Sequence, residues 1–543
     1  MKINKPELYF FYLVVFINLF PFISYKFFPT MDGAAHLYNS NLITELLRGN
    51  PRLNSFYEFN HIPVPNWSGH FLLALFNTFL PAWMAEKILL VFYAISFPLV
   101  FRNLIKIYSP ENTLLSYLIF PFIYSALFYL GFYNFYLGII FLLITTVYWI
   151  NNMATLTLKK GILLFCLITI TYFCHLFSYV LLISILSLLL LQDYVRSIIN
   201  NGTTKNVKSK FNRQLTFLVA TSFFTVLMFI KYLLIIHISG DNQKLGTAEL
   251  FKWISDVKPL IALNREEESP YTIKYFYLLL ILTAIALYVK IQNIKQTTFA
   301  GRNSVRALFY TFHKSDVWII VFGVALILFF KVPNGANAGM MSDRLCLLFF
   351  IFYIVWIATQ PLPKWLGVVS AVSLLYFNLG LLSYHIKTTR DLSNDAVEYN
   401  SVAEHIDENS VVLPINYSTH WLQGHFSNYM GIDKPLIILE NYEATLDWFP
   451  VKWKNNETVD RMRNHNSCDI GIDSKKENID YIVIWGREQD TTDNCVKKFK
   501  EGLQEHYDLV YESPRKVAHL YKLKKRSSIV SDGNYNANGL PNN

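Results

Sequence analysis

Long runs of apolar residues alternate with short polar segments over the first 387 positions of the chain. Because about 20 apolar residues can cross the hydrocarbon core of a bilayer as a helix, the pattern predicts about eleven membrane-spanning helices, in a range of about ten to thirteen. The expected spans are 8–25, 84–101, 113–130, 132–151, two within 161–192, 214–237, 272–289, 316–331, 345–360 and 365–386.

Three of these runs need a closer interpretation. Residues 161–192 contain no charged residue and are too long for one span, so they predict a hairpin that turns near residues 174–178. The apolar stretch 69–81 is short and predicts an interfacial segment or a short helix. The first run, 8–25, follows two lysines and precedes many more apolar runs, which favours a signal anchor over a cleaved signal peptide.

The charges between the runs predict an orientation. Segments 193–213 and 290–315 are strongly basic and are expected on the cytoplasmic side, whereas 239–271 is rich in acidic residues and is expected outside. Alternation from these anchors places the N-terminus in the cytoplasm, and it places the loop 26–68 and everything after residue 387 outside.

The pattern changes after residue 387. Short β-type runs at 410–413, 435–439, 481–485, 509–511 and 518–521 alternate with the helical segments 396–406 and 493–505. This alternation predicts a small α/β domain over 388–525, and the polar residues 526–543 predict a disordered tail. The expected fold class is therefore a polytopic α-helical membrane protein, with its membrane domain at 1–387 and a small extracytoplasmic α/β domain at its C-terminal end.

Composition supports a membrane protein. Hydrophobic residues make up 53% of the 543 residues and charged residues 16%, compared with about 25% charged in soluble proteins. These values exclude disordered, collagen-like and disulfide-dense small proteins and disfavour an ordinary soluble enzyme. The net charge of +9 is explained by basic segments between the spans better than by nucleic-acid binding.

The five cysteines divide into two groups. Cys166, Cys174 and Cys346 lie in apolar segments and are expected to be small core residues. Cys468 and Cys495 lie in the polar C-terminal region and predict one disulfide in an oxidising compartment. The alternative for this pair is two buried thiols.

The first candidate site lies just after the first span, in the segment FPTMDGAAHLY. On a helix over 31–47, Asp32 and His36 are four residues apart and share a face. A carboxylate at the membrane boundary can accept a proton from a hydroxyl group. The alternative is that Asp32 only caps the N-terminus of the helix.

A second cluster closes the same loop. His61, Asn66, Trp67 and His70 present polar groups near the membrane surface, where they could bind a substrate or serve as an aromatic anchor with polar neighbours. Asn134 lies at a predicted outer turn, where it either binds a ligand hydroxyl or stabilises the turn.

Basic residues mark the outer ends of two later spans. The planar guanidinium group of Arg344 suits phosphate oxygens, and Lys331 ends the preceding span on the same side. The alternative for Arg344 is an internal pair with Asp343 or another carboxylate.

Further candidates lie in the C-terminal region. His420 and His425 flank an indole in the segment HWLQGH, which could hold a sugar; ordinary surface or core histidines are the alternative. The segment ENYE, residues 440–443, follows a predicted strand and is a weaker candidate for a loop that faces the membrane domain.

The layout of these features resembles the GT-C superfamily of integral-membrane glycosyltransferases, which includes protein O-mannosyltransferases and the lipid A aminoarabinose transferase. The resemblance rests on Asp32 just past the first span, a large first external loop, many further spans and an external α/β domain. It implies transfer of a sugar from a polyprenyl-phosphate carrier to an extracytoplasmic lipid, glycan or protein. It also implies Asp32 as catalytic base with His36 beside it, and Arg344 with Lys331 at the carrier phosphate.

The resemblance also bears on cofactors and location. No nucleotide is required, which agrees with the absence of nucleotide-binding motifs from the sequence. Many members have an Asp-Glu pair in the first loop, where this chain has Asp32-Gly33. A divalent cation, Mg²⁺ or Mn²⁺, is compatible with the resemblance, and no residue is assigned to bind it. The implied location is the bacterial inner membrane.

Three further functions stay open. A transporter or flippase of lipid-linked glycans needs polar groups inside several spans, whereas residues 113–158 and 161–192 carry no charge and His175 is their one histidine. The candidate residues gather at the outer face instead, which favours an enzyme. The second open function is that of a noncatalytic envelope assembly protein, and the third is that of an envelope polymerase or ligase.

Overall fold

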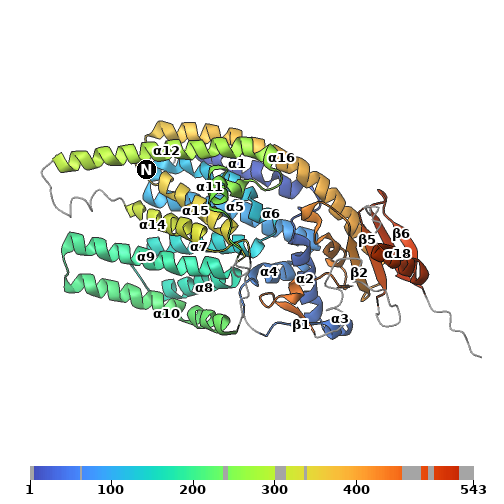
Figure 1. Cartoon of the computed structure of the whole chain (residues 1–543). Helices are drawn as coiled ribbons and strands as arrows, with labels where there is room; N and C mark the ends of the chain where they lie inside the picture. The colour runs from blue at the N-terminus through green and yellow to red at the C-terminus, as the bar shows by residue number, and fades with distance from the viewer. Residues whose placement is uncertain are drawn as a thin grey trace, which may run out of the picture.

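The computed structural model describes residues 5–61, 64–235, 243–299, 314–335, 339–454, 479–486 and 494–524. Helices that run side by side fill one end of the molecule, and a small sheet with its covering helix lies at the other end (Figure 1). The predicted fold class, a polytopic helical protein with a small C-terminal sheet region, is confirmed. The predicted tail 526–543 lies outside the described residues.

Every expected membrane span overlaps one helix. These helices are α1 (Lys5–Ser24), α5 (Ala82–Tyr108), η1 (Pro110–Tyr124), α7 (Tyr133–Asn152), α8 (Leu158–Cys174), α9 (Leu176–Asn201), α10 (Lys205–Ile235), α12 (Arg265–Phe299), α14 (Val317–Lys331), α15 (Met341–Ala358) and α16 (Lys364–Val402). Within the described part of the chain, nine helical segments are long and apolar enough to cross a membrane. Of the others, α8 has 17 residues and α14 has 15.

The hairpin predicted within 161–192 is confirmed. Helix α8 ends at Cys174, and α9 begins two residues later at Leu176. His175 between them has an extended backbone, with φ −162° and ψ 128°, which breaks the helix without a glycine or proline. Helix α16 continues without a break through position 387 to Val402.

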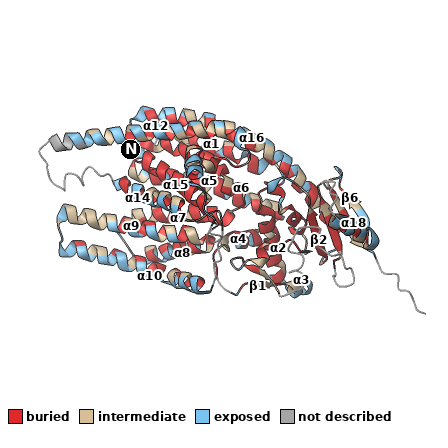
Figure 2. Ribbon diagram, in the orientation of Figure 1, coloured by how far each residue is buried: buried red, intermediate tan, exposed pale blue. Residues whose placement is uncertain are grey.

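Burial within the bundle separates central helices from peripheral ones (Figure 2). Helix α15 is buried along almost its whole length. Helix α10 instead exposes Phe223, Leu227, Ile230 and Leu234. Their spacing of three and four residues puts these apolar side chains on one face, as expected where a helix faces lipid.

The loop after α1 folds into four short elements. They are α2 (Gly33–Leu47), α3 (Pro51–Phe56), β1 (Tyr57–Phe59) and α4 (Ser68–Asn77). The last is the short helix expected over 69–81. Strand β1 pairs antiparallel with β4 (Val451–Trp453), so Tyr57 lies opposite Trp453 with ring centroids 4.1 Å apart.

The C-terminal region contains a five-stranded sheet in the order β3-β2-β5-β7-β6. Its strands are β2 (Val411–Asn416), β3 (Ile437–Ile438), β5 (Tyr481–Trp485), β6 (Tyr507–Glu512) and β7 (Ala518–Leu523), and α18 (Asn494–His506) precedes β6. Strand β2 pairs parallel with β3 and β5, and β7 pairs antiparallel with β5 and β6. Strands β2 and β5 are almost continuously apolar because neighbours cover both of their faces.

Short helices complete the described chain. They are α6 (Ala126–Tyr129), α11 (Thr247–Ser255), η2 (Lys258–Leu260), η3 (Lys314–Asp316), η4 (Ala403–His405), η5 (Trp421–Gln423), η6 (Phe426–Gly431) and η7 (Glu443–Thr445). The last three belong to the long connections between strands of the C-terminal region.

Helix α2 joins the first loop to the C-terminal region. The Tyr38 hydroxyl donates to the Leu436 carbonyl at 2.7 Å and accepts from the Ile438 amide at 3.0 Å. The Asn39 and Asn441 side chains exchange two amide hydrogen bonds of 2.9 and 3.0 Å. The loop 26–68 and the region after 387 therefore lie at the same end of the molecule (Figure 1), as the charge pattern predicts.

Candidate functional site

A cavity of about 380 Å³ lies where α2, α7 and α15 meet the segments that follow β3. Six of the residues singled out in the sequence line it, although they are spread from position 32 to position 425. The lining comprises Met31, Asp32, His36, Asn66, Leu130, Phe132, Tyr133, Asn134, Phe135, His175, Met340, Arg344, His425, Tyr442, Leu446, Trp448 and Phe449.

Asp32 is held at the start of α2 by backbone contacts with the turn before α7. Its amide donates to the Leu130 carbonyl at 3.2 Å. Gly131 has φ +88°, and a Cβ there would lie 2.9 Å from the Cβ of Asp32, so this close approach requires a glycine. Asp32 occupies the N-cap position of α2, but its side chain makes no capping hydrogen bond. The carboxylate instead faces the C-terminal region.

The surroundings of the Asp32 carboxylate alter its acidity. Burial raises its pKa, and the positive charges of His36 and His425 partly oppose this effect. Nε2 of His425 lies 3.8 Å from Oδ1 of Asp32, and the Tyr442 hydroxyl hydrogen-bonds to the same carboxylate. A buried carboxylate with a raised pKa is suited to accept a proton near neutral pH.

His425 is itself oriented by a second carboxylate. Its Nδ1 contacts Oε1 of Glu440, whose other oxygen accepts hydrogen bonds from Ser427, at 2.8 Å, and from Asn428. Burial lowers the pKa of His425, but the charge and hydrogen bond of Glu440 outweigh burial and raise that pKa to about 9. The imidazole also stacks on Tyr442 with centroids 4.2 Å apart. Asp32, His425 and Glu440 thus form a chain of alternating charge.

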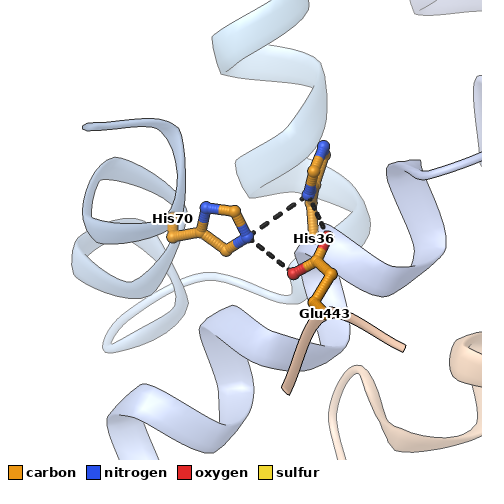
Figure 3. A group of neighbouring side chains, drawn as sticks. All are labelled: His36, His70 and Glu443. Carbon is orange, nitrogen blue, oxygen red and sulfur yellow. Dashed lines mark hydrogen bonds and ion pairs between the residues drawn. The ribbon is translucent and has the colours of Figure 1, made fainter. Parts of the chain in front are cut away.

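A second cluster lies behind His36 (Figure 3). Nδ1 of His36 lies 2.5 Å from Oε1 of Glu443, and Nε2 of His70 lies 2.8 Å from Oε2 of the same residue. The two imidazole nitrogens are 3.2 Å apart. Burial raises the pKa of Glu443, but His36 and His70 outweigh it and hold that pKa below its usual range.

His36 therefore belongs to both clusters. Burial opposes its protonated form, but the Glu443 carboxylate, with a smaller contribution from Asp32, raises the pKa of His36 to about 9. Its Nε2 donates to the Gly131 carbonyl at 2.8 Å. The predicted pairing of Asp32 and His36 on one face of a helix is observed, and the structure adds the partners from the C-terminal region.

Arg344 lies at another wall of the cavity. One terminal nitrogen donates to the Gly339 carbonyl at 2.9 Å, and the guanidinium lies 4.8 Å from the ring centroid of Phe132 and 5.8 Å from that of Phe135. Among the described residues no carboxylate is within ion-pair distance of Arg344, and its Nε is buried without a hydrogen-bond partner. The internal pair of this arginine with Asp343 is not observed.

Asn134 and Asn66 line the cavity but are engaged with the backbone. Oδ1 of Asn134 accepts from the Gly69 amide at 2.6 Å, and its Nδ2 donates to the Asn66 carbonyl at 2.9 Å. Asn66 has φ +71°. This pair therefore fixes the approach of the first loop to α4, and with it the position of His70.

Four more candidate residues lie away from the cavity lining. His61 and Lys331 are exposed, and Nδ1 of His420 accepts from the Leu422 amide at the start of η5. Trp67 is half-buried and packs on Phe71, with ring centroids 5.5 Å apart.

The cysteines give a mixed result. Cys174 and Cys346 are buried, as expected, whereas the expectation for Cys166 is wrong because it is exposed on the outer side of α8. The disulfide predicted between Cys468 and Cys495 involves side chains outside the described part of the structure.

Glu440, Tyr442 and Glu443 complete the site and come from the segment 440–443, which the sequence marks only weakly. Four polar or acidic residues directly after a buried strand are the one local signal for them. Glu440 binds His425 only 15 positions earlier, whereas the partners of Glu443, His36 and His70, lie about 400 positions earlier, and no local pattern connects those two segments.

Comparison with known proteins identifies the fold. The crystal structure of apo ArnT from Cupriavidus metallidurans superposes with a TM-score of 0.51 at 8% identity, covering 95% of this chain and 98% of that one. The structure of the same protein bound to undecaprenyl phosphate gives a TM-score of 0.41 at 10% identity, covering 96% and 98%. No family model and no curated protein matches the sequence.

ArnT is the lipid A aminoarabinose transferase, of the GT-C class. The chain therefore has an ArnT-like fold, and with its apolar helices it is an integral membrane protein. The architecture suggested by the order of spans, first loop and C-terminal region is confirmed.

Proposed function

We propose that this protein is a membrane glycosyltransferase that moves a sugar from a polyprenyl-phosphate carrier to an extracytoplasmic lipid, glycan or protein. One observation carries the proposal: the buried carboxylate of Asp32 and the guanidinium of Arg344 line the same cavity, at the end of the helix bundle where the C-terminal region docks. A base and an anion-binding group are the two functions that such a transfer requires. The ArnT-like fold supports this assignment.

Asp32 acts as the base. An acceptor hydroxyl or amine attacks the anomeric carbon of the donor sugar and transfers its proton to the Asp32 carboxylate. The raised pKa of Asp32 makes it a stronger base than an exposed aspartate. His425, held by Glu440, positions Asp32 and stabilises its charged form before the acceptor binds.

Arg344 binds the leaving group. As the new glycosidic bond forms, the bond between the anomeric carbon and the phosphate oxygen breaks, and the carrier phosphate departs with its negative charge. A guanidinium without an internal carboxylate partner stabilises this charge directly. Phe132 and Phe135, beside Arg344, supply apolar surface for the first isoprene units of the carrier.

The direction of transfer follows from the location of the cavity. The carrier tail stays among the apolar helices while its phosphate enters at the end that the charge pattern places outside the cytoplasm. We place the protein in a bacterial inner membrane, with its N-terminus in the cytoplasm and its C-terminal region outside.

The test compares envelope glycans by mass spectrometry in a strain that lacks the gene. The strain is complemented with the wild type, Asp32→Asn or His61→Ala at matched membrane levels. We expect one sugar to be lost in the null strain and restored by the wild type and by His61→Ala. In vitro, Asp32→Asn should lower turnover by about 100- to 10,000-fold, the usual contribution of a general base.

His61 is a matched control because it is exposed and belongs to the same loop. Full restoration of the glycan by Asp32→Asn would exclude Asp32 as the base. An unchanged glycan profile in the null strain, together with accumulation of carrier-linked sugar on one side of the membrane, would instead favour a flippase.

A further inference from the structure

We propose that His36, His70 and Glu443 form a zinc-binding site that joins the membrane domain to the C-terminal region. The proposal does not depend on the transferase function, since it concerns what these side chains bind. Three residues from α2, α4 and η7 place one donor atom each within 4.8 Å of one another (Figure 3). Their exposed fractions are 5%, 1% and 0%.

The ligand set matches that of zinc. Two histidines and one glutamate bind Zn²⁺ in known catalytic sites and leave a fourth position open. Donor atoms about 2.0–2.1 Å from a tetrahedral ion are about 3.3 Å apart, and Nδ1 of His36 lies 3.2 Å from Nε2 of His70. Two nitrogen donors favour zinc over Mg²⁺, which prefers oxygen ligands. The Glu443 oxygens lie 2.5 and 2.8 Å from these nitrogens, so the carboxylate would move outward by roughly 0.5–1 Å to admit the ion.

The outer hydrogen bonds orient both imidazoles as metal ligands. His36 donates through Nε2 to the Gly131 carbonyl at 2.8 Å, and Nδ1 of His70 lies 3.2 Å from the Asn66 carbonyl. Because a carbonyl oxygen only accepts, the Gly131 contact places the proton of a neutral His36 ring on its outer nitrogen; at His70 the Asn66 carbonyl at 3.2 Å favours the same arrangement over the more distant Asn134 amide nitrogen at 3.4 Å. The lone pairs of the inner nitrogens then point toward each other and toward Glu443. A metal-bound histidine usually has such a carbonyl partner on its other nitrogen.

One oxygen of the carboxylate also lacks a well-aligned partner among the described residues, whereas Oε2 lies at hydrogen-bond distance, 2.8 Å, from Nε2 of His70. Oε1 of Glu443 lies 2.5 Å from Nδ1 of His36, but within the described residues it accepts no hydrogen bond. When both rings are neutral, three electron-pair donors meet in this buried space, which calls for a positive charge between them. Zinc supplies two charges at one point; the competing arrangement is a proton on each inner nitrogen.

A bound ion would cross-link distant parts of the chain. His36 and His70 come from the first loop, whereas Glu443 follows β3 in the C-terminal region. His36 also lines the cavity beside Asp32. The ion would therefore hold His36 in place next to the Asp32 carboxylate.

The test measures metal in the full-length chain purified in detergent, after chelation, incubation with excess zinc and removal of the free ion. We expect about one zinc per chain in the wild type and in His61→Ala, and roughly tenfold less or lower in His70→Ala and Glu443→Gln. X-ray absorption at the zinc edge should show two imidazole nitrogens and a carboxylate oxygen at about 2.0–2.2 Å.

Thermal unfolding separates loss of the ion from loss of the fold. Chelator should lower the midpoint of the wild type and of His61→Ala and leave those of His70→Ala and Glu443→Gln unchanged. A zinc content that is equal in wild type and Glu443→Gln would overturn the proposal. A wild type that retains no zinc would also overturn it, and would indicate that protons on the inner nitrogens of His36 and His70 balance the Glu443 charge. No transfer assay enters these measurements, so this proposal and the transferase function can fail separately.

Discussion

The two ends of the cavity differ in how their charges are compensated. At one end, the protein supplies both signs: the Asp32 carboxylate faces His425, which contacts Glu440 in turn. At the other end, Arg344 faces two aromatic rings and a backbone carbonyl, and no described carboxylate pairs with it. The first end is preorganised by its own charges, whereas the second, in our proposal, is completed by an anion from outside. This difference is why we assign the base to the first end and the carrier phosphate to the second.

The largest expected change in the free energy of unfolding is that of a substitution at Glu440. Glu440→Gln removes the nearer partner of the buried His425 cation and leaves it only the Asp32 carboxylate at 3.8 Å, so we expect a loss of up to about 3–5 kcal/mol in the free energy of unfolding. Thermal or denaturant unfolding of the full chain in mild detergent measures this loss.

Asp447→Asn is the matched control for Glu440→Gln. Asp447 pairs with Lys452 in the same part of the chain, but its side chain is 67% exposed. We expect a change below about 1 kcal/mol for an exposed pair of this kind. Equal losses in the two variants would show that the Glu440 end is not preorganised by charge.

The next effect is a dependence of stability on pH. The pKa of His425 rises from 6.5 to about 9 on folding. Because the folded-state pKa is the higher one, this stabilisation is complete below pH 6.5 and is lost as the pH rises through about 9. It amounts to at most about 3 kcal/mol.

Unfolding of wild type and His425→Gln across this pH range isolates the contribution. His36 titrates in the same window, so the difference between the two curves, rather than either curve alone, reports on His425. That difference should shrink steadily from pH 6.5 to 9. A constant difference would remove His425 from the charge compensation of Asp32.

The smallest predicted effect concerns the other end of the cavity. Arg344→Gln should weaken binding of polyprenyl phosphate by about 1.5–3 kcal/mol, the contribution of a charged hydrogen bond. It should change the free energy of unfolding by less than about 1 kcal/mol, since no carboxylate loses its partner. Native mass spectrometry with the lipid phosphate measures the binding.

Lys331→Gln provides the comparison for Arg344→Gln. It removes an equal charge from an exposed residue outside the cavity lining. Equal binding losses in the two variants would assign the effect to general electrostatic attraction, and a large loss of stability in Arg344→Gln would reveal an internal role for the arginine.

Much of the fold could be predicted because its signals are local. An uncharged run that is too long for one span predicted a turn near residues 174–178, and the helices do break there, at His175; the run 481–485 coincides with β5. Two spans are shorter than the about 20 residues of a typical membrane helix, since α8 and α14 have 17 and 15 residues. The end of the last span could not be predicted, because the polar residues after 387 continue the same helix to Val402.

The sequence made the site residues of the membrane domain predictable, but not the acidic residues of the C-terminal region. Asp32, His36 and Arg344 stand out because charged or titratable groups at the ends of apolar runs are costly and conspicuous. Glu440 and Glu443 are ordinary acidic residues by sequence; Glu440 lies only 15 positions after His425, but tertiary packing alone brings Glu443 to His36 and His70. Long-range pairings of this kind leave no periodicity in a single sequence.

The antiparallel pairing of β1 with β4 has a consequence for biosynthesis. Tyr57 is synthesised early and Trp453 late. The whole membrane domain is therefore synthesised before β1 of the first loop can pair with β4. Until then α2 carries Asp32 without His425, Glu440, Tyr442 or Glu443. A nascent or truncated chain therefore inserts in the membrane with an unfinished cavity, and completion of the chain is the event that assembles the site.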